Sequence, residues 1–115
     1  MTDKRKFKRR HLIYYLQVKD IQTDNFIGYV VDLSYSGLMI MSQNPIEVNK
    51  TFQLQVMIPN GQEEKPNYLD FEAKSVRSIN TSNPHFYDTG FELLNVKMED
   101  FKQIYEVIEN LGFKE

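Results

Sequence analysis

The sequence contains no cysteine and only two histidines, His11 and His85. The missing thiols exclude a disulfide framework and a thiolate metal site, and the two histidines do not form a metal-ligand pattern. A glycine-rich phosphate loop of the Walker type is absent as well. These absences argue against an enzyme, and we expect no catalytic residue, no metal and no cofactor.

Long hydrophobic runs are also lacking. No segment approaches the roughly 20 apolar residues of a membrane span, and the polar, basic segment 1–10 has no apolar core of the kind a secretory signal needs. We therefore expect a cytoplasmic protein that makes no membrane contact. A length of 115 residues predicts one domain, which is large enough to bury a hydrophobic core.

Charge is distributed unevenly along the chain. Residues 1–10 hold six bases and one acid, a net charge of +5, whereas residues 11–115 have a net charge of −7. A basic arm on an acidic body indicates a local anion site more than a broad nucleic-acid surface. The alternative is a solvated tail with no function.

Most of the chain after residue 11 has the period-two pattern of β-strands. The clearest case is Phe52, Leu54 and Val56, which alternate with polar neighbours. Similar runs predict strands near 14–19, 26–33, 38–41, 69–79 and 86–94, with a bulge near Ser75 because Val76 falls out of phase. Six or so short strands without intervening helices predict a mainly β fold, a closed or nearly closed antiparallel barrel.

The period changes to that of a helix near the C-terminus. Asn95 is placed to cap this helix, Glu99 and Asp100 suit the dipole of its first turn, and Gly112 stands at a stop position. We expect one apolar face to cover an open side or end of the barrel, formed by Met98, Phe101, Ile104, Tyr105, Ile108 and Leu111.

The basic arm contains the first candidate binding motif. Arg5 and Arg9 are four residues apart, so both could reach one ligand from an extended, looping arm. The arginine fork matches the O6 and N7 acceptors of guanine, and its plane can stack on a base. Basic arms are common, however, and two arginines at this spacing are not specific by themselves.

The second candidate motif is the hexapeptide from Asp32 to Gly37, which separates two apolar runs. The Asp32 carboxylate can accept hydrogen bonds from the N1–H and N2–H₂ groups of guanine, and Ser34 offers a hydroxyl. Gly37 permits a backbone conformation, or a close ligand approach, that other residues resist. The alternative is a plain hairpin turn with capping side chains and a glycine at positive φ.

Taken together, the two motifs resemble the PilZ domain, the bacterial receptor module for cyclic di-GMP. An Arg-x-x-x-Arg arm leads into the first strand, and Asp-x-Ser-x-x-Gly follows about twenty residues later. Thr89-Gly90-Phe91-Glu92-Leu93 looks like the last-strand pattern of that family. The resemblance extends over essentially the whole chain.

The resemblance implies a six-stranded antiparallel PilZ-type β-barrel with a C-terminal α-helix. It divides the chain into a flexible arm, residues 1–10, and a barrel with its helix, residues 11–115. The arginines would contact guanine and phosphate, Arg10 would assist or replace Arg9, and the second motif would hold the ligand from the barrel surface. The implied ligand-binding residues are Arg5, Arg9, Arg10, Asp32, Ser34 and Gly37.

We expect the arm to act as a switch. Self-repulsion should keep it mobile without ligand, and a dianionic ligand should draw it across the barrel. Because the chain holds no second domain, an effector protein would read the new surface in trans, in a process such as motility or biofilm control.

Two further interpretations remain open. A PilZ-like scaffold could act through protein contacts alone and bind no nucleotide. A nucleic-acid binder of the OB type is also a small barrel with aromatic residues, but the −7 body would repel a polyanion beyond the arm.

Overall fold

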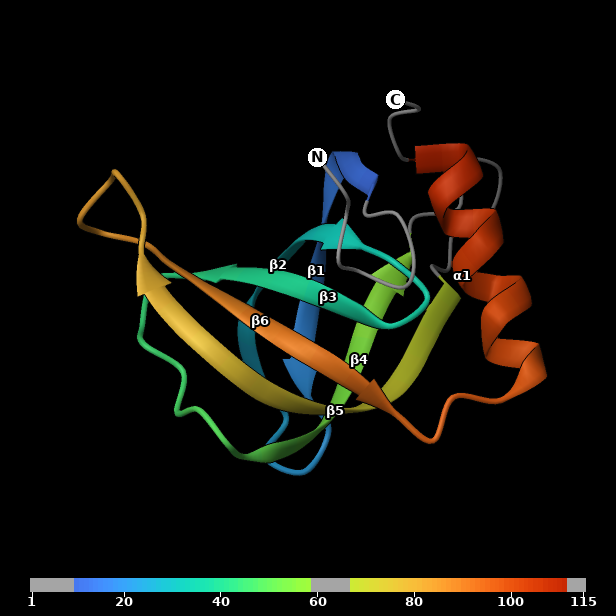
Figure 1. The fold of residues 1–115 in the computed structure, drawn as a ribbon, viewed down its shortest axis with the longest axis horizontal. Helices are drawn as coiled ribbons and strands as arrows, with labels where there is room; N and C mark the ends of the chain where they lie inside the picture. The colour runs from blue at the N-terminus through green and yellow to red at the C-terminus, as the bar shows by residue number, and fades with distance from the viewer. Residues whose placement is uncertain (1–9, 59–66, 112–115) are drawn as a thin grey trace, which may run out of the picture.

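Six antiparallel strands form a closed barrel, followed by one helix. The computed structural model describes residues 10–58 and 67–111, with the side chains of residues 15–58, 68–107 and 109. The elements are β1 (Arg10–Asp20), β2 (Asn25–Leu33), β3 (Gly37–Ser42), β4 (Thr51–Ile58), β5 (Asn67–Asn80), β6 (Tyr87–Leu94) and α1 (Met98–Leu111). The predicted mainly β barrel with a C-terminal helix is confirmed (Figure 1).

The strand order around the barrel is β1-β2-β3-β6-β5-β4, and β4 pairs with β1 to close it. Hairpins join β1 to β2, β2 to β3 and β5 to β6, whereas β3 and β6 are neighbours although they are distant in sequence. The closing ladder joins Val18–Asp20 of β1 to Leu54–Val56 of β4, which reduces the exposed sheet edge among the described residues. It also gives the barrel an outer face on which residues from distant strands meet.

The core consists of the inward side chains of the alternating strands. In β4, Phe52, Leu54 and Val56 are buried while their polar neighbours lie on the outer side, as the period-two pattern predicted. Leu54 and Ile40 have no exposed surface, so truncation of either to alanine would cost about 2–5 kcal/mol.

A bulge in β5 changes the phase of that strand where the sequence predicted it. Ser75 pairs with Phe91 and Arg77 with Gly90, so Val76 is the extra residue. The Ser75 side chain is fully buried, and its hydroxyl donates to the Glu47 carbonyl at 2.6 Å and accepts from the Lys50 N–H at 3.1 Å. These bonds fasten the connection between β3 and β4 to the barrel.

Lys97, and not Asn95, caps the N-terminus of α1. The Lys97 carbonyl accepts the first helical N–H groups, from Asp100 and Phe101, and the Asp100 carboxylate accepts the Lys97 N–H at 2.9 Å. Asn95 lies further back with a φ of 52° and donates to Glu72 from its side chain. The predicted Asn95 cap is therefore wrong, because the chain makes a left-handed turn there before the helix begins.

The helix buries only part of the predicted face, and the side chains of Ile108 and Leu111 lie outside the described ones. Ile104 and Val107 are buried and join the barrel core, whereas Met98 is 75% exposed and Tyr105 is 54% exposed. The apolar arc of α1 is wider than the strip that the barrel can cover, so one edge of it stays in solvent. Figure 1 shows α1 at one end of the barrel, beside the β2–β3 turn. Within the described residues, no helix is long and apolar enough to cross a membrane.

Candidate functional site

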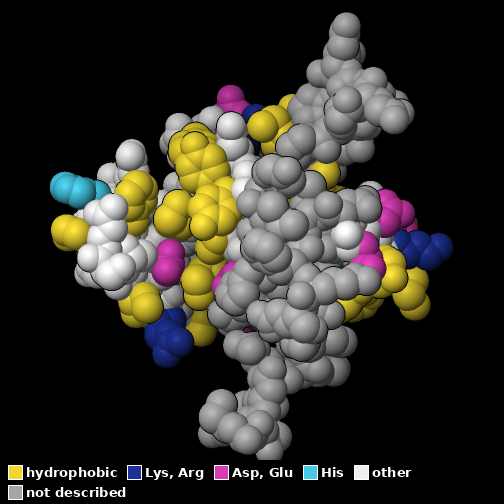
Figure 2. All heavy atoms as spheres, turned by 90° about the horizontal axis from the view of Figure 1, so that it is seen from above, with side chains coloured by type: hydrophobic (Ala, Val, Ile, Leu, Met, Phe, Trp, Pro, Cys, Tyr) yellow, Lys and Arg dark blue, Asp and Glu magenta, His cyan; other side chains and the backbone are white. Residues whose placement is uncertain are grey.

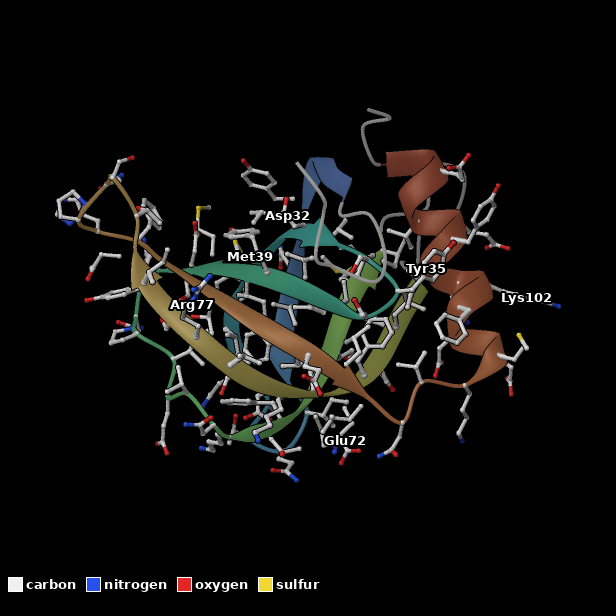
Figure 3. All side chains as sticks on the ribbon, viewed as in Figure 1. Asp32, Tyr35, Met39, Glu72, Arg77 and Lys102 are labelled. Carbon is white, nitrogen blue, oxygen red and sulfur yellow. The ribbon has the colours of Figure 1, made fainter. Side chains whose placement is uncertain are left out.

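A bulge in β2 places Asp32 on the outer face of the barrel. Val30 pairs with Ile40, but Asp32 pairs with Met39, so Val31 is the extra residue. Directly paired residues share a face of the sheet, and Met39 lies on the outer face because the inward Ile40 follows it. Asp32 is only 6% exposed, and it lies near Met39 in Figure 3.

The arm ends beside this aspartate. Arg10, the last residue of the predicted arm, begins β1 and pairs with Leu33, and His11 pairs with Asp32. Two parts of the chain that are about twenty residues apart in sequence therefore meet in the sheet. Arg5 and Arg9 lie outside the described residues, as does the side chain of Arg10.

Ser34 organises the turn between β2 and β3. Its backbone N–H donates to the Gly37 carbonyl at 2.9 Å, and its hydroxyl accepts from the N–H groups of Ser36 and Gly37 at 3.4 and 3.3 Å. The serine thus makes the bonds that a plain hairpin turn predicts. The hydroxyl also donates to the Gly37 carbonyl at 3.3 Å.

Gly37 is required by the neighbouring strand and not by an unusual backbone angle. No described glycine has a positive φ, contrary to the hairpin interpretation. A Cβ at Gly37 would lie 2.5 Å from the Phe91 carbonyl oxygen of β6, which is far inside van der Waals contact. Leu93 of the same strand donates its N–H to the Ser36 carbonyl at 2.9 Å. The motif turn is therefore held against β6.

A groove of about 690 Å³ runs along the outer face beside this turn. Its floor is formed by β3, β6 and β5, the strands that closure of the barrel brings together. Residues that line it include Ser34, Gly37, Met39, Arg77, Asp88 and Gly90. Of the second motif, Ser34 and Gly37 line this groove, together with residues that the sequence analysis did not select, whereas Asp32 does not line it.

Gly90 leaves the middle of the groove open. A Cβ at this position would meet only the Arg77 carbonyl oxygen, at 4.0 Å. The strand itself tolerates a side chain there, in contrast to Gly37. The glycine therefore adds room above β6 without a packing reason of its own.

Three charged groove residues were not selected by the sequence analysis, Arg77, Asp88 and Glu92. The phase change at the β5 bulge is the signal that places Arg77 on this face (Figure 3). Asp88 lies two residues before Gly90 and thus on the same side of β6. Burial raises the pKa of the Asp88 carboxyl, and the negative charge of Asp32 raises it further.

The chemical character of the groove comes from the side chains that line it. The described residues contain no cluster of three or more histidine, cysteine or acidic side chains that could hold a metal ion. The groove instead combines carboxylates, a hydroxyl and a guanidinium over an apolar floor, which is the composition of a small-molecule site. The fold is a small closed β-barrel whose outer face carries this groove, and β1 begins at Arg10 beside residues of the second motif.

The chain belongs to the PilZ domain family, whose model matches residues 3–110. This match extends over both sequence motifs, the barrel and nearly all of α1. A search of the curated proteins finds no match.

Solved structures share the fold at low sequence identity. The PilZ domain of YcgR from Escherichia coli with c-di-GMP matches with a TM-score of 0.68 and 17% identity, over 95% of this chain and 92% of that one. The Bacillus subtilis inhibitor of motility, MotI/DgrA, matches with a TM-score of 0.74 and 15% identity. YcgR in complex with c-di-GMP matches with a TM-score of 0.71 and 16% identity.

The larger neighbours extend beyond the matched region. The match covers 95% of this chain but 51% of MotI/DgrA and 46% of YcgR, so the chain spans about half of either protein. At these identities the likeness establishes the fold, which agrees with the barrel described above.

Proposed function

We propose that this protein is a cyclic di-GMP receptor that changes its contacts with an effector protein when the ligand binds. The observation that carries the proposal is the pairing of Arg10 with Leu33 and of His11 with Asp32, at the border of the β3-β6-β5 groove. This pairing brings the basic arm to the residues of the second motif. Family membership and the c-di-GMP complexes of YcgR support the choice of ligand.

The two motifs divide the ligand between them on electrostatic grounds. Among the described residues, the groove and its border carry the carboxylates of Asp32, Asp88 and Glu92 against the guanidinium of Arg77. Such a surface repels phosphate but accepts the N–H edge of a guanine. The phosphates must then be bound by the arm, through Arg5 and Arg9 with Arg10 assisting, and the same arginines reach the O6 and N7 acceptors of guanine.

The barrel residues bind the N–H edge of the guanine base. Asp32 accepts the N1–H and N2–H₂ groups of guanine, Ser34 exchanges a long turn contact for a bond to the ligand, and Gly37 keeps the turn close to β6. A groove of about 690 Å³ is of the size that ligands of this class occupy. In this scheme the arm closes over the bound nucleotide, and the effector reads the closed arm.

The proposed activity is binding and signalling in the cytoplasm, without catalysis. The motility-inhibitor neighbour suggests control of motility as the output, and biofilm control is the related alternative. The partner is a protein that recognises the ligand-bound arm in trans.

Calorimetric titration of the purified protein with cyclic di-GMP tests the proposal, with cyclic di-AMP and GTP as controls. We expect selective binding of cyclic di-GMP at micromolar concentration or below. Arg9→Ala should weaken it by about five- to 150-fold, the loss of one bidentate guanine contact. Lys19→Ala removes an exposed base that pairs with Asp24 at the β1–β2 turn and should leave binding unchanged.

A failure to bind cyclic di-GMP would contradict the proposal. If a folded sample free of bound nucleotide gives neither heat nor a thermal shift with cyclic di-GMP, the receptor function is wrong. The barrel would then be a protein-interaction scaffold, the second candidate, and the search for its partner would begin on its exposed apolar surface.

A further inference from the structure

The helix α1 has a second apolar strip that the barrel does not cover. Ile104 and Val107 are buried in the core, but Met98 is 75% exposed and Tyr105 is 54% exposed. Met98, Phe101 and Tyr105 follow the spacing of three and four residues that aligns side chains along one helix face. Phe101 lies between the two strips and is half-buried. Solvent exposure of such a strip disfavours the free protein unless a partner covers it.

Tyr35 extends this strip into a groove. Its ring packs against Phe101 with centroids 5.6 Å apart and an interplanar angle of 55°. The resulting groove has a volume of about 590 Å³ and is lined by Tyr35, Met98, Phe101, Lys102, Tyr105 and Glu106. Figure 3 shows Tyr35 beside α1, on the other side of the turn from Arg77.

The helix is net acidic around the apolar groove, although the groove itself is lined by one acid, Glu106, and one base, Lys102. The helix carries Glu99, Asp100, Glu106 and Glu109 against one base, Lys102, and its last turn has none. Glu99 and Glu106 are exposed and lie two turns apart on one face. Figure 2 shows hydrophobic, acidic and basic atoms together at the right-hand edge, the side on which α1 lies in Figure 1.

We propose that this groove docks an amphipathic helix of a partner protein, whose apolar face is flanked by lysine or arginine. A helix laid along α1 would insert apolar side chains between Tyr35 and Tyr105 and set its bases against Glu99 and Glu106. The acidic rim disfavours an anionic membrane, a nucleic acid and a second copy of the same acidic face. The groove lies apart from the nucleotide groove, so this surface goes beyond the proposed receptor function.

Binding of two synthetic amphipathic helices to the ligand-free protein tests the proposal. Both peptides have the same leucine face, flanked by lysines in one and by glutamates in the other, and fluorescence anisotropy measures their affinity. We expect the lysine peptide alone to bind wild-type protein. Tyr105→Ala should weaken it about tenfold or more, because it removes an exposed aromatic anchor.

Two further variants test the role of the rim charge and provide a control. Glu106→Lys should weaken the lysine peptide and reduce the effect of salt on its binding, because it reverses a rim charge. Tyr68→Ala removes an aromatic side chain that is 52% exposed on β5, and it should change nothing. Circular dichroism would establish that each variant keeps the wild-type fold.

Three results would overturn the proposal. They are equal binding of the glutamate peptide, no binding of either peptide up to about 1 mM, and a lysine-peptide affinity that Tyr105→Ala and Tyr68→Ala affect alike. Because no nucleotide is present, none of these results depends on whether cyclic di-GMP binds.

Discussion

The negative charge of Asp32 on β2 raises the pKa of Asp88 on β6, although β3 lies between their strands. Burial of Asp88 is the larger cause, and the neighbouring charge adds to it. Two carboxylates held together on a barrel surface disfavour the folded state when both are ionised. Such an arrangement is typical of a binding site, where a ligand with N–H donors relieves the repulsion.

Asp88→Asn should stabilise the ligand-free protein at neutral pH. A folded-state pKa above the ordinary carboxyl value means that ionisation of Asp88 opposes folding, so the neutral amide removes that cost. The gain should shrink as pH falls and vanish below about pH 4, where the carboxyl is protonated in both states. Thermal melts of both proteins between acid and neutral pH measure the difference, which solvent screening limits to a few degrees.

The control for this effect is Asp70→Asn. Asp70 is exposed on β5 and accepts a hydrogen bond from Gln55 at 3.1 Å, away from the β3-β6-β5 groove. The melting temperature of the Asp70→Asn variant should not rise above that of the wild type at neutral pH. A stabilisation of Asp70→Asn equal to that of Asp88→Asn would mean that general charge reduction, and not this carboxylate pair, is responsible.

Asp32→Asn should reduce the preference for guanine over adenine dinucleotides. The amide replaces one acceptor oxygen of Asp32 with a donor, so one hydrogen bond from the guanine edge is lost and a clash of donors replaces it. We expect about 1–3 kcal/mol of lost discrimination, measured as the ratio of dissociation constants for cyclic di-GMP and cyclic di-AMP. An unchanged ratio would remove Asp32 from the base-reading role.

Gly37 and Gly90 should respond in opposite ways to an added side chain. Gly37→Ala places a Cβ 2.5 Å from the Phe91 carbonyl and should destabilise the barrel by about 1–3 kcal/mol. Gly90→Val adds a Cβ that meets only the Arg77 carbonyl oxygen, at 4.0 Å, and valine suits a strand, so we expect it to keep wild-type stability and lower ligand affinity by filling the groove. Urea unfolding and calorimetry on both variants separate the two effects. Ligand affinity unaffected by Gly90→Val would place the nucleotide elsewhere.

The sequence predicted the features that depend on local pattern. Period-two runs such as Phe52, Leu54 and Val56 gave correct strands, and the out-of-phase Val76 indicated the β5 bulge. The β2 bulge at Val31 leaves no such mark, because Val30 and Val31 are adjacent and either valine suits an inward position. The bulge turns Asp32 outward, and this orientation could therefore be seen only in the structure.

Features that depend on strand order were beyond the sequence. Asp88 and Arg77 join the motif turn only because β6 and β5 follow β3 around the barrel. The width of the apolar arc on α1 was visible, but which part the barrel covers was not. Tertiary packing selected Ile104 and Val107 and left Met98 and Tyr105 outside. The roles of Arg5 and Arg9 stay predictions, since both lie outside the described residues.

Tyr35 should couple the two grooves. It belongs to the turn that carries Ser34 and Gly37, and its ring contacts Phe101 of α1. A nucleotide that shifts this turn must therefore alter the groove on α1, and by linkage a helix docked there must alter nucleotide affinity by the same factor. We expect cyclic di-GMP to change the affinity of the lysine-flanked peptide by about five- to 150-fold.

Tyr35→Leu tests whether this contact transmits the change. Leucine keeps an apolar side chain against α1 but loses the ring contact with Phe101, so each ligand alone should still bind while the coupling falls toward zero. Titration of each ligand in the absence and presence of the other closes the thermodynamic cycle for wild type and variant. Full coupling in Tyr35→Leu would mean that the grooves communicate by another route, for example through Leu93 and its bond to the Ser36 carbonyl.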